Sequence, residues 1–304
     1  MKTTKILPFV ILSSLILAAC DSVEDELPPV SSDMNYTEVN LLSNNINDDT
    51  AIDAGPESSF NGLELYFHSN RTGGSGGLDL YVSKRASKND SWGPAVNLGA
   101  TINSAADDRA ASIAKDGLTL IFASDRVGGT GTDNLDLYIS TRTSLTADWS
   151  TPTNLGTVIN TTFNESGADI QAQGLLMFFH SDRPGGLGGD DIYAVNRASI
   201  LDPWGEPVHL GTNVNSSDFD TAPEAASDLL TLYFHSTRPG GTGSHNIWRS
   251  TRASITDIWS VPVLLPAPVN SAAADLGVGL SSDWKILYFA SDFGGNRDIW
   301  QAEP

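Results

Sequence analysis

The sequence predicts an all-β protein, a five-bladed β-propeller with four-stranded blades. Three observations favour this fold: one motif recurs five times, each repeat divides into four short strands, and no helical period appears. The motif is clearest in SDRPGGLGGDDIY, residues 181–193. Its serine recurs at intervals of 55, 57, 55 and 55 residues, at Ser69, Ser124, Ser181, Ser236 and Ser291.

The strands within a repeat follow from alternating hydrophobicity and turn residues. In the second repeat, strands are expected at residues 95–99, 109–114, 118–124 and 136–140, with a turn at Asp116 and Gly117 before the third. No single repeat could bury its apolar faces alone, so the repeats are expected to stack as blades around an axis.

Closure of the ring follows from the phase of the repeat. The chain begins its first unit at the NLL strand and ends at IWQAEP, so the last blade lacks its outermost strand. Pairing residues 38–41 with residues 299–301 would complete that blade and hide both exposed strand edges. We therefore expect one propeller domain over residues 36–304.

A resemblance to a known family rests on the whole motif. Copies such as LYFHSNRTGGSGGLDLY and LYFHSTRPGGTGSHNIW, preceded by W-x-x-P-x-x-L, resemble the WD40-like β-propeller repeats of TolB-type and related bacterial envelope proteins. The resemblance covers about residues 36–304. Such repeats occur in binding proteins, peptidases and lyases, so it implies a fold rather than an activity.

Residues 1–20 read as a secretory signal peptide. Lys2 and Lys5 precede the apolar run ILPFVILSSLILAA, which is shorter than the ~20 residues of a transmembrane helix. The ending LAAC resembles the lipobox of bacterial lipoproteins, which implies that Cys20 is acylated, as by palmitate, and becomes the mature N-terminus. Cys20 is the only cysteine, so disulfides are excluded. The alternative is an ordinary signal peptide with an incidental cysteine.

Composition indicates where the mature chain acts. Residues 21–35, DSVEDELPPVSSDMN, read as an acidic tether. We expect a membrane-anchored lipoprotein of the bacterial cell envelope, on its periplasmic or surface side, and a monomer. The formal charge of −20 disfavours nucleic acid, which needs Lys and Arg to neutralise phosphates. An envelope protein or a glycan is the expected partner.

The glycine loops are expected to be turns. A calcium-binding β-helix repeats its Gly/Asp motif every nine residues, whereas these loops recur with the whole blade. The acids after the loops, such as Asp79, are expected to form hydrogen bonds or ion pairs inside each blade, together with arginines such as Arg71. Only the third loop, where Asp190 stands beside Asp191, is compatible with a lone calcium ion.

An acid stands 14 residues before each motif phenylalanine, at Asp53, Asp108, Glu165, Asp220 and Asp275. Small residues follow two positions later, and three further acids two beyond those, at Glu57, Asp169 and Glu224. Alternate residues of a strand share a face, so all eight acids are predicted to line the central channel. Such a ring would need protonation, arginine partners or a bridging cation in the channel, and carboxylate oxygens with water suit Ca²⁺ as that cation. Alternatively, the five repeated acids cap turns.

Three histidines break the symmetry of the repeat. His68, His180 and His235 follow the motif phenylalanine in three units, and alanine takes that place in the other two. They are predicted to lie on the same rim as the five acids, where His and carboxylate could bind a ligand or a metal ion or exchange protons. Alternatively, each is a half-buried strand residue.

The function that these patterns favour is a non-catalytic binding or scaffold module, because no nucleophile elbow, HExxH motif, phosphate loop or nucleotide fingerprint is present. The alternative is a carbohydrate-active enzyme, a glycosidase or lyase, that uses Glu57, Asp169 and Glu224. The chain is similar to the five-bladed glycosidases in its expected architecture only and has none of their sequence motifs. A channel plugged by side chains would exclude it.

Overall fold

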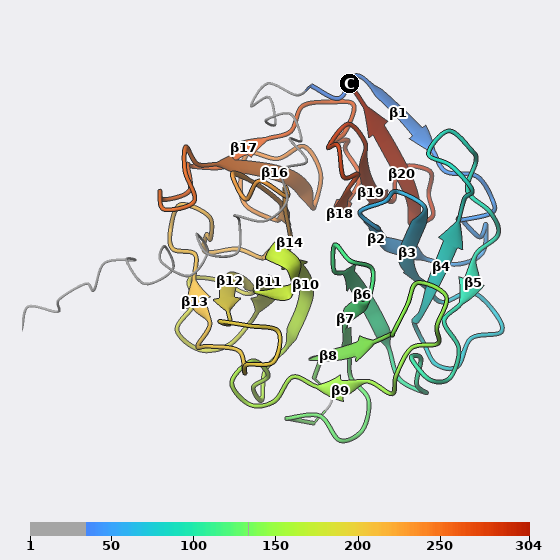
Figure 1. Ribbon diagram of the computed structural model, residues 1–304. Helices are drawn as coiled ribbons and strands as arrows, with labels where there is room; N and C mark the ends of the chain where they lie inside the picture. Colours follow the sequence, from blue (N-terminus) through green and yellow to red (C-terminus); the bar gives the residue numbers. More distant parts are fainter. Residues whose placement is uncertain (1–34, 133) are drawn as a thin grey trace, which may run out of the picture.

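The protein is a five-bladed β-propeller, and the computed structural model describes residues 35–132 and 134–304 (Figure 1). Five antiparallel four-stranded sheets surround a central axis, which confirms the predicted fold class. The predicted signal peptide, Cys20 and nearly all of the predicted tether lie outside the described residues. Within those residues, no helix has both the length and the apolar character needed to cross a membrane.

Four blades are continuous in the chain, each with its innermost strand first. Blade one contains β2 (Asp53–Ser58), β3 (Glu64–Ser69), β4 (Asp79–Lys84) and β5 (Val96–Asn97). Blade two contains β6 (Asp108–Ile113), β7 (Thr119–Ser124), β8 (Asp136–Thr141) and β9 (Thr153–Asn154). Blade three contains β10 (Glu165–Gln171), the 3-10 turn η1 (Ala172–Gly174), β11 (Leu176–Ser181), β12 (Asp191–Asn196) and β13 (Val208–His209). Blade four contains β14 (Asp220–Ala225), β15 (Thr231–Ser236), β16 (Asn246–Thr251) and β17 (Val263–Leu264).

Blade five joins the two ends of the chain. It contains β18 (Asp275–Leu280), β19 (Leu287–Ser291) and β20 (Asp298–Glu303), and its outer strand is β1 (Glu38–Leu41). The register pairs Glu38 with Glu303 and Leu41 with Trp300, so the predicted closure is confirmed.

The innermost strands contain a bulge that the sequence pattern did not predict. In β2 the pairing shifts between Ala54 and Glu57, and Gly55 between them has a φ of 61°. The equivalent small residues of the other blades also have positive φ angles; they are Ala110, Gly167, Ala222 and Gly277. The extra residue puts Glu57 on the opposite face from Asp53. The prediction that all eight acids share one channel-lining face is therefore wrong.

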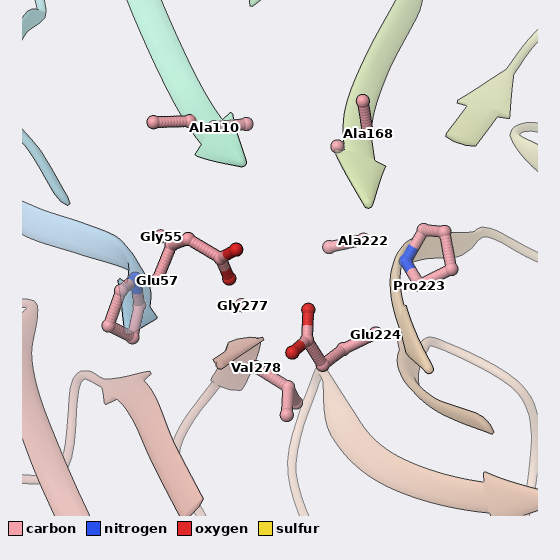
Figure 2. A pocket seen from close by; sticks show the side chains of 12 residues that line it. Gly55, Glu57, Ala110, Ala168, Ala222, Pro223, Glu224, Gly277 and Val278 are labelled. Carbon is pink, nitrogen blue, oxygen red and sulfur yellow. The ribbon is translucent and has the colours of Figure 1, made fainter. Parts of the chain in front are cut away.

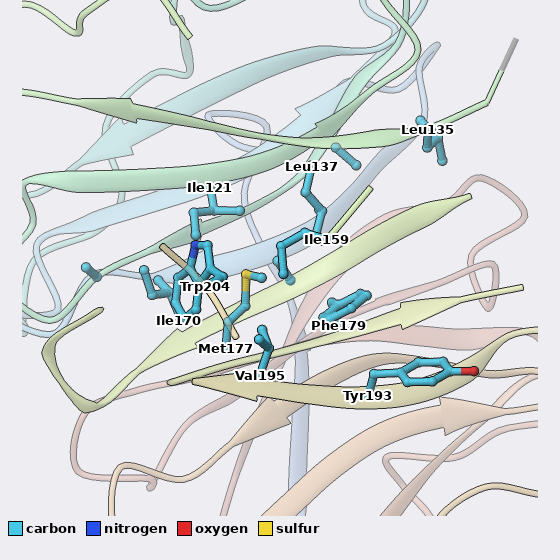
Figure 3. Close-up of a cluster of buried hydrophobic side chains, with 13 residues drawn as sticks. Ile121, Leu135, Leu137, Ile159, Ile170, Met177, Phe179, Tyr193, Val195 and Trp204 are labelled. Carbon is cyan, nitrogen blue, oxygen red and sulfur yellow. The ribbon is translucent and has the colours of Figure 1, made fainter. Parts of the chain in front are cut away.

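Apolar side chains pack between neighbouring blades. In one cluster, Ile121 and Leu137 of blade two meet Met177 and Phe179 of blade three (Figure 3). The motif tryptophans belong to such clusters: Trp92 of blade one meets Tyr288 of blade five edge-on, with 6.3 Å between ring centroids. These inter-blade contacts hold the innermost strands in place around the channel.

Candidate functional site

The centre of the propeller holds a small cavity lined by the bulged parts of the innermost strands. Glu57 and Glu224 extend into it from two blades (Figure 2). Most of the other lining residues are small, such as Gly55, Ala110 and Gly277. Its volume is about 40 Å³, which suits a few water molecules because each water needs about 10–15 Å³.

In the first four blades, the side chain of the fifth residue of the innermost strand binds that blade to the next. Each uses an oxygen to accept a backbone N–H from the innermost strand of the following blade. The pairs are Glu57 with Ile113 at 3.2 Å, Ser112 with Ile170 at 3.0 Å, Asp169 with Ala225 at 2.7 Å, and Glu224 with Leu280 at 3.3 Å. The three acids predicted as catalytic therefore connect the blades.

These three carboxyls are close enough to influence one another's charge. Burial raises the pKa of Asp169 from 3.8 to about 7. Burial and the nearby charge of Asp169 raise the pKa of Glu57 well above its usual value. Burial, Glu57 and Asp169 do the same for the pKa of Glu224. The arrangement therefore disfavours the ionised form of all three carboxyls.

The five repeated acids lie at the first residue of each innermost strand and are buried, at 0–1% exposure. Each accepts a backbone N–H from the turn before its strand, at 2.5–2.7 Å. Four of them also pair with the motif arginine of their own blade: Asp53 with Arg71, Asp108 with Arg126, Glu165 with Arg183, and Asp220 with Arg238. These contacts agree with the alternative that the five acids cap turns. A ligand-binding role for them stays a prediction.

The fifth acid lacks an arginine because Phe293 stands at that position. Asp275 accepts hydrogen bonds from Ser271 and Ser291 instead. Its pKa is raised, chiefly by burial. Blade five therefore departs from the other four at the rim.

The glycine loops are turns closed by the acid that follows them. Asp79 accepts N–H groups of Ser75 at 2.5 Å and Gly76 at 3.1 Å, and Asp191 accepts that of Leu187 at 2.7 Å. Arg71 pairs with Asp53 and not with Asp79. Across residues 35–132 and 134–304, no group of three or more His, Cys, Asp or Glu is arranged to hold a metal ion.

The three histidines lie on the predicted rim, each one residue from the serine that pairs with a repeated acid. Their Nδ1 atoms accept backbone N–H groups of the next blade: His68 from Ala110 at 3.4 Å, His180 from Ala222 at 3.1 Å, and His235 from Gly277 at 3.2 Å. Burial lowers the pKa of His68 and His180 to about 3, so both are neutral at physiological pH. Their use in ligand binding or proton transfer stays a prediction.

Arg109, the second residue of β6, is a rim residue that the sequence analysis did not select. Its Nε is buried and has no hydrogen-bond partner within the described part of the chain. Charge at this position could have identified it, because the other blades have uncharged residues there: Ala54, Ser166, Thr221 and Leu276.

Comparison with known proteins places the fold. No protein-family model matches the sequence, and no curated protein matches it. Among solved structures, the chain is similar to TolB from Acinetobacter baumannii, with 12% identity and a TM-score of 0.52, over 85% of this chain and 56% of that one. It therefore spans little more than half the length of that TolB.

Two further structures are similar to the chain. The putative TolB from Agrobacterium tumefaciens has 17% identity and a TM-score of 0.50, over 83% of this chain and 76% of that one. The endo-arabinase from Bacteroides thetaiotaomicron has 14% identity and a TM-score of 0.57, over 89% of this chain and 98% of that one. At these identities the likeness shows a propeller fold shared by TolB proteins and glycoside hydrolases.

Proposed function

We propose that the chain is a non-catalytic binding lipoprotein of the bacterial cell envelope, whose propeller holds a protein or glycan partner at the histidine-bearing rim. The observation that supports this most is that the acids at the channel are engaged in hydrogen bonds between blades and leave only a small cavity. Glu57, Asp169 and Glu224 accept backbone N–H groups between blades, and the cavity beside them has about 40 Å³. Ligand pockets usually have ~300–1,000 Å³, so the small size of this cavity supports a binding role over cleavage of a sugar at these carboxyls.

The cellular location rests on the sequence. The apolar run that ends at Cys20 and the resemblance of the repeats to those of TolB-type envelope proteins both support a lipid-anchored envelope protein. Several acyl chains on Cys20 would hold the propeller stably at a membrane surface.

The proposal is tested by recovering the lipidated protein from its own membranes after mild cross-linking. Mass spectrometry of proteins and glycans that co-purify should reveal one enriched partner. Cys20→Ser is the control for anchoring and should lose both radiolabelled palmitate and membrane association. A native protein that retains no partner would contradict the binding function.

A second candidate is a carbohydrate-active enzyme, favoured by one observation. The pKa of Asp169 is about 7 and the pKa values of Glu57 and Glu224 are raised, and a general acid requires a carboxyl with a raised pKa. The likeness to an endo-arabinase suggests arabinan and 4-nitrophenyl arabinofuranoside as substrates. If the native protein cleaves either substrate and Glu224→Gln does not, the chain is an enzyme and the binding proposal is wrong. If the native protein cleaves neither substrate, the binding proposal is supported.

A further inference from the structure

The channel mouth contains a cation without an ionic partner among residues 35–132 and 134–304. The motif arginines of the first four blades, such as Arg126, all pair with buried acids. Arg109 lies one residue after one of those acids, Asp108, yet forms no ion pair there. Its Nε is buried without a hydrogen-bond acceptor, and the next two residues, Ala110 and Ala111, line the central cavity. A buried N–H without an acceptor in the protein is unfavourable, so a ligand that supplied the acceptor would be bound favourably at this position.

Two histidines add hydrogen-bond donors beside this arginine. The Nδ1 atoms of His68 and His180 accept backbone N–H groups, so in the neutral rings the proton must lie on Nε2. Neither Nε2 has a partner within the described chain, so both Nε2–H groups are available as donors. The ring of His68 contacts Ala110, the residue after Arg109. The charge of Arg109 contributes to the lowered pKa of both histidines, which is consistent with its lying near both.

We propose that Arg109, together with the Nε2–H groups of His68 and His180, binds a carboxylate of the partner at the channel mouth. This inference rests on the proposed binding function and names the chemistry that the partner must carry. A guanidinium presents parallel N–H groups that match the two oxygens of a carboxylate, and neutral histidines add donors without adding charge.

The charges around the site favour a single negative charge. Burial raises the pKa of Asp190 to about 6, and the positive charge of Arg109 opposes this rise. The two side chains do not form a salt bridge within residues 35–132 and 134–304. The single positive charge of Arg109, in a chain of net charge −20, can balance a carboxylate but not a phosphate dianion. The carboxylate belongs to an acidic sugar or to a peptide, and the shared chemistry is what this site recognises.

The test uses the full lipidated protein in detergent, labelled with ¹⁵N, and follows the Nε–H resonance of Arg109. Sodium glucuronate is compared with glucose, and N-acetylglycine with N-acetylglycinamide. We expect a saturable shift in the millimolar range with at least one carboxylate and with neither neutral compound. Binding of glucuronate alone assigns an acidic glycan, and binding of N-acetylglycine alone assigns a peptide carboxylate.

Calorimetry of three variants then tests the residue. Arg109→Gln should weaken carboxylate binding at least tenfold, and Arg109→Lys should weaken it less because the charge remains. Lys285→Gln is the matched control: it removes one positive charge from an exposed turn on the opposite rim and should leave the affinity unchanged. Thermal melting shows that each variant is folded.

Two results would overturn the inference: no shift with any carboxylate, or equal binding by Arg109→Gln and the native protein. The proposed function can fail separately. If a partner co-purifies equally with the native protein and Arg109→Gln, the binding function stands and the carboxylate site is wrong. If carboxylates bind but no partner co-purifies, the site stands and the binding function is contradicted.

Discussion

Glu224→Gln should stabilise the propeller more at pH 8 than at pH 5. Glu224 accepts the N–H of Leu280 through Oε1, so a glutamine keeps this acceptor and removes the charge. Burial and the charges of Glu57 and Asp169 raise the pKa of Glu224 well above its usual value. Each pKa unit between the unfolded and the folded protein is worth about 1.36 kcal/mol, so the ionised carboxylate of Glu224 costs stability above its unfolded pKa.

The sign follows from which state holds the proton. Between the unfolded and folded pKa values of these carboxyls, the folded protein retains protons that the unfolded chain releases, so the free energy of unfolding falls as pH rises. His68 and His180 act oppositely below about pH 6.5, where only the unfolded chain binds their protons. Above about pH 6.5 these two histidines no longer contribute to the pH dependence of the free energy of unfolding, and the effect of the carboxyls can be measured without them. A buried amide has its own desolvation cost of about 1–3 kcal/mol, so we expect a net gain of about 1–3 kcal/mol at pH 8.

The assay is urea unfolding followed by tryptophan fluorescence at both pH values. Glu206→Gln, which removes an exposed carboxylate, is the matched control and should change little at either pH. At pH 5 the gain from Glu224→Gln should be smaller, because a raised pKa of Glu224 leaves less of the ionised form in the folded protein at lower pH. Equal effects at both pH values, or a loss of stability at pH 8, would refute the reasoning.

Three further predictions concern the rim and the bulge. Phe293→Arg should supply the missing partner of Asp275, raise the free energy of unfolding by about 1–2 kcal/mol and lower the pKa of Asp275, which NMR titration can follow. Arg126→Ala should destabilise the protein by about 3 kcal/mol in urea unfolding, because it leaves Asp108 buried without its ionic partner; a loss below about 1 kcal/mol would contradict this. Ala110→Gly should be neutral or stabilising by up to about 1 kcal/mol, since Ala110 has a φ of 52°. The same change at its neighbour Ala111, where φ is ordinary, should destabilise by about 1 kcal/mol, and equal effects of the two changes would contradict this account.

The blades, their strands and the closure of the ring could be predicted because they depend on local patterns and on a long repeat interval. The bulge at Gly55 could not, because counting alternate residues assumes an uninterrupted strand. A single extra residue reverses every later side chain, so Glu57 and Asp53 were placed on the same face although they lie on opposite faces.

The candidate site was predicted only in part for a similar reason. The repeated acids and histidines were found by their recurrence, and the structure shows the intra-blade and inter-blade contacts that recurring residues make. Arg109 occurs in a single blade, so the repeat pattern does not identify it. Its burial and its missing partner depend on neighbouring blades, which the sequence does not place.

The closure of blade five has a mechanical consequence. β1 lies antiparallel to β20, and both ends of the ring leave the molecule at the same edge (Figure 1). A load applied to the chain at residue 35 would reach Tyr36 first and then the pair Glu38–Glu303, from which β1 would peel away one residue pair at a time. Tyr36 stands before that strand, only 3% exposed, with its hydroxyl 3.4 Å from the carbonyl of Trp284. The resistance of the propeller to a pull on its N-terminal side therefore depends on how firmly one aromatic side chain holds its place.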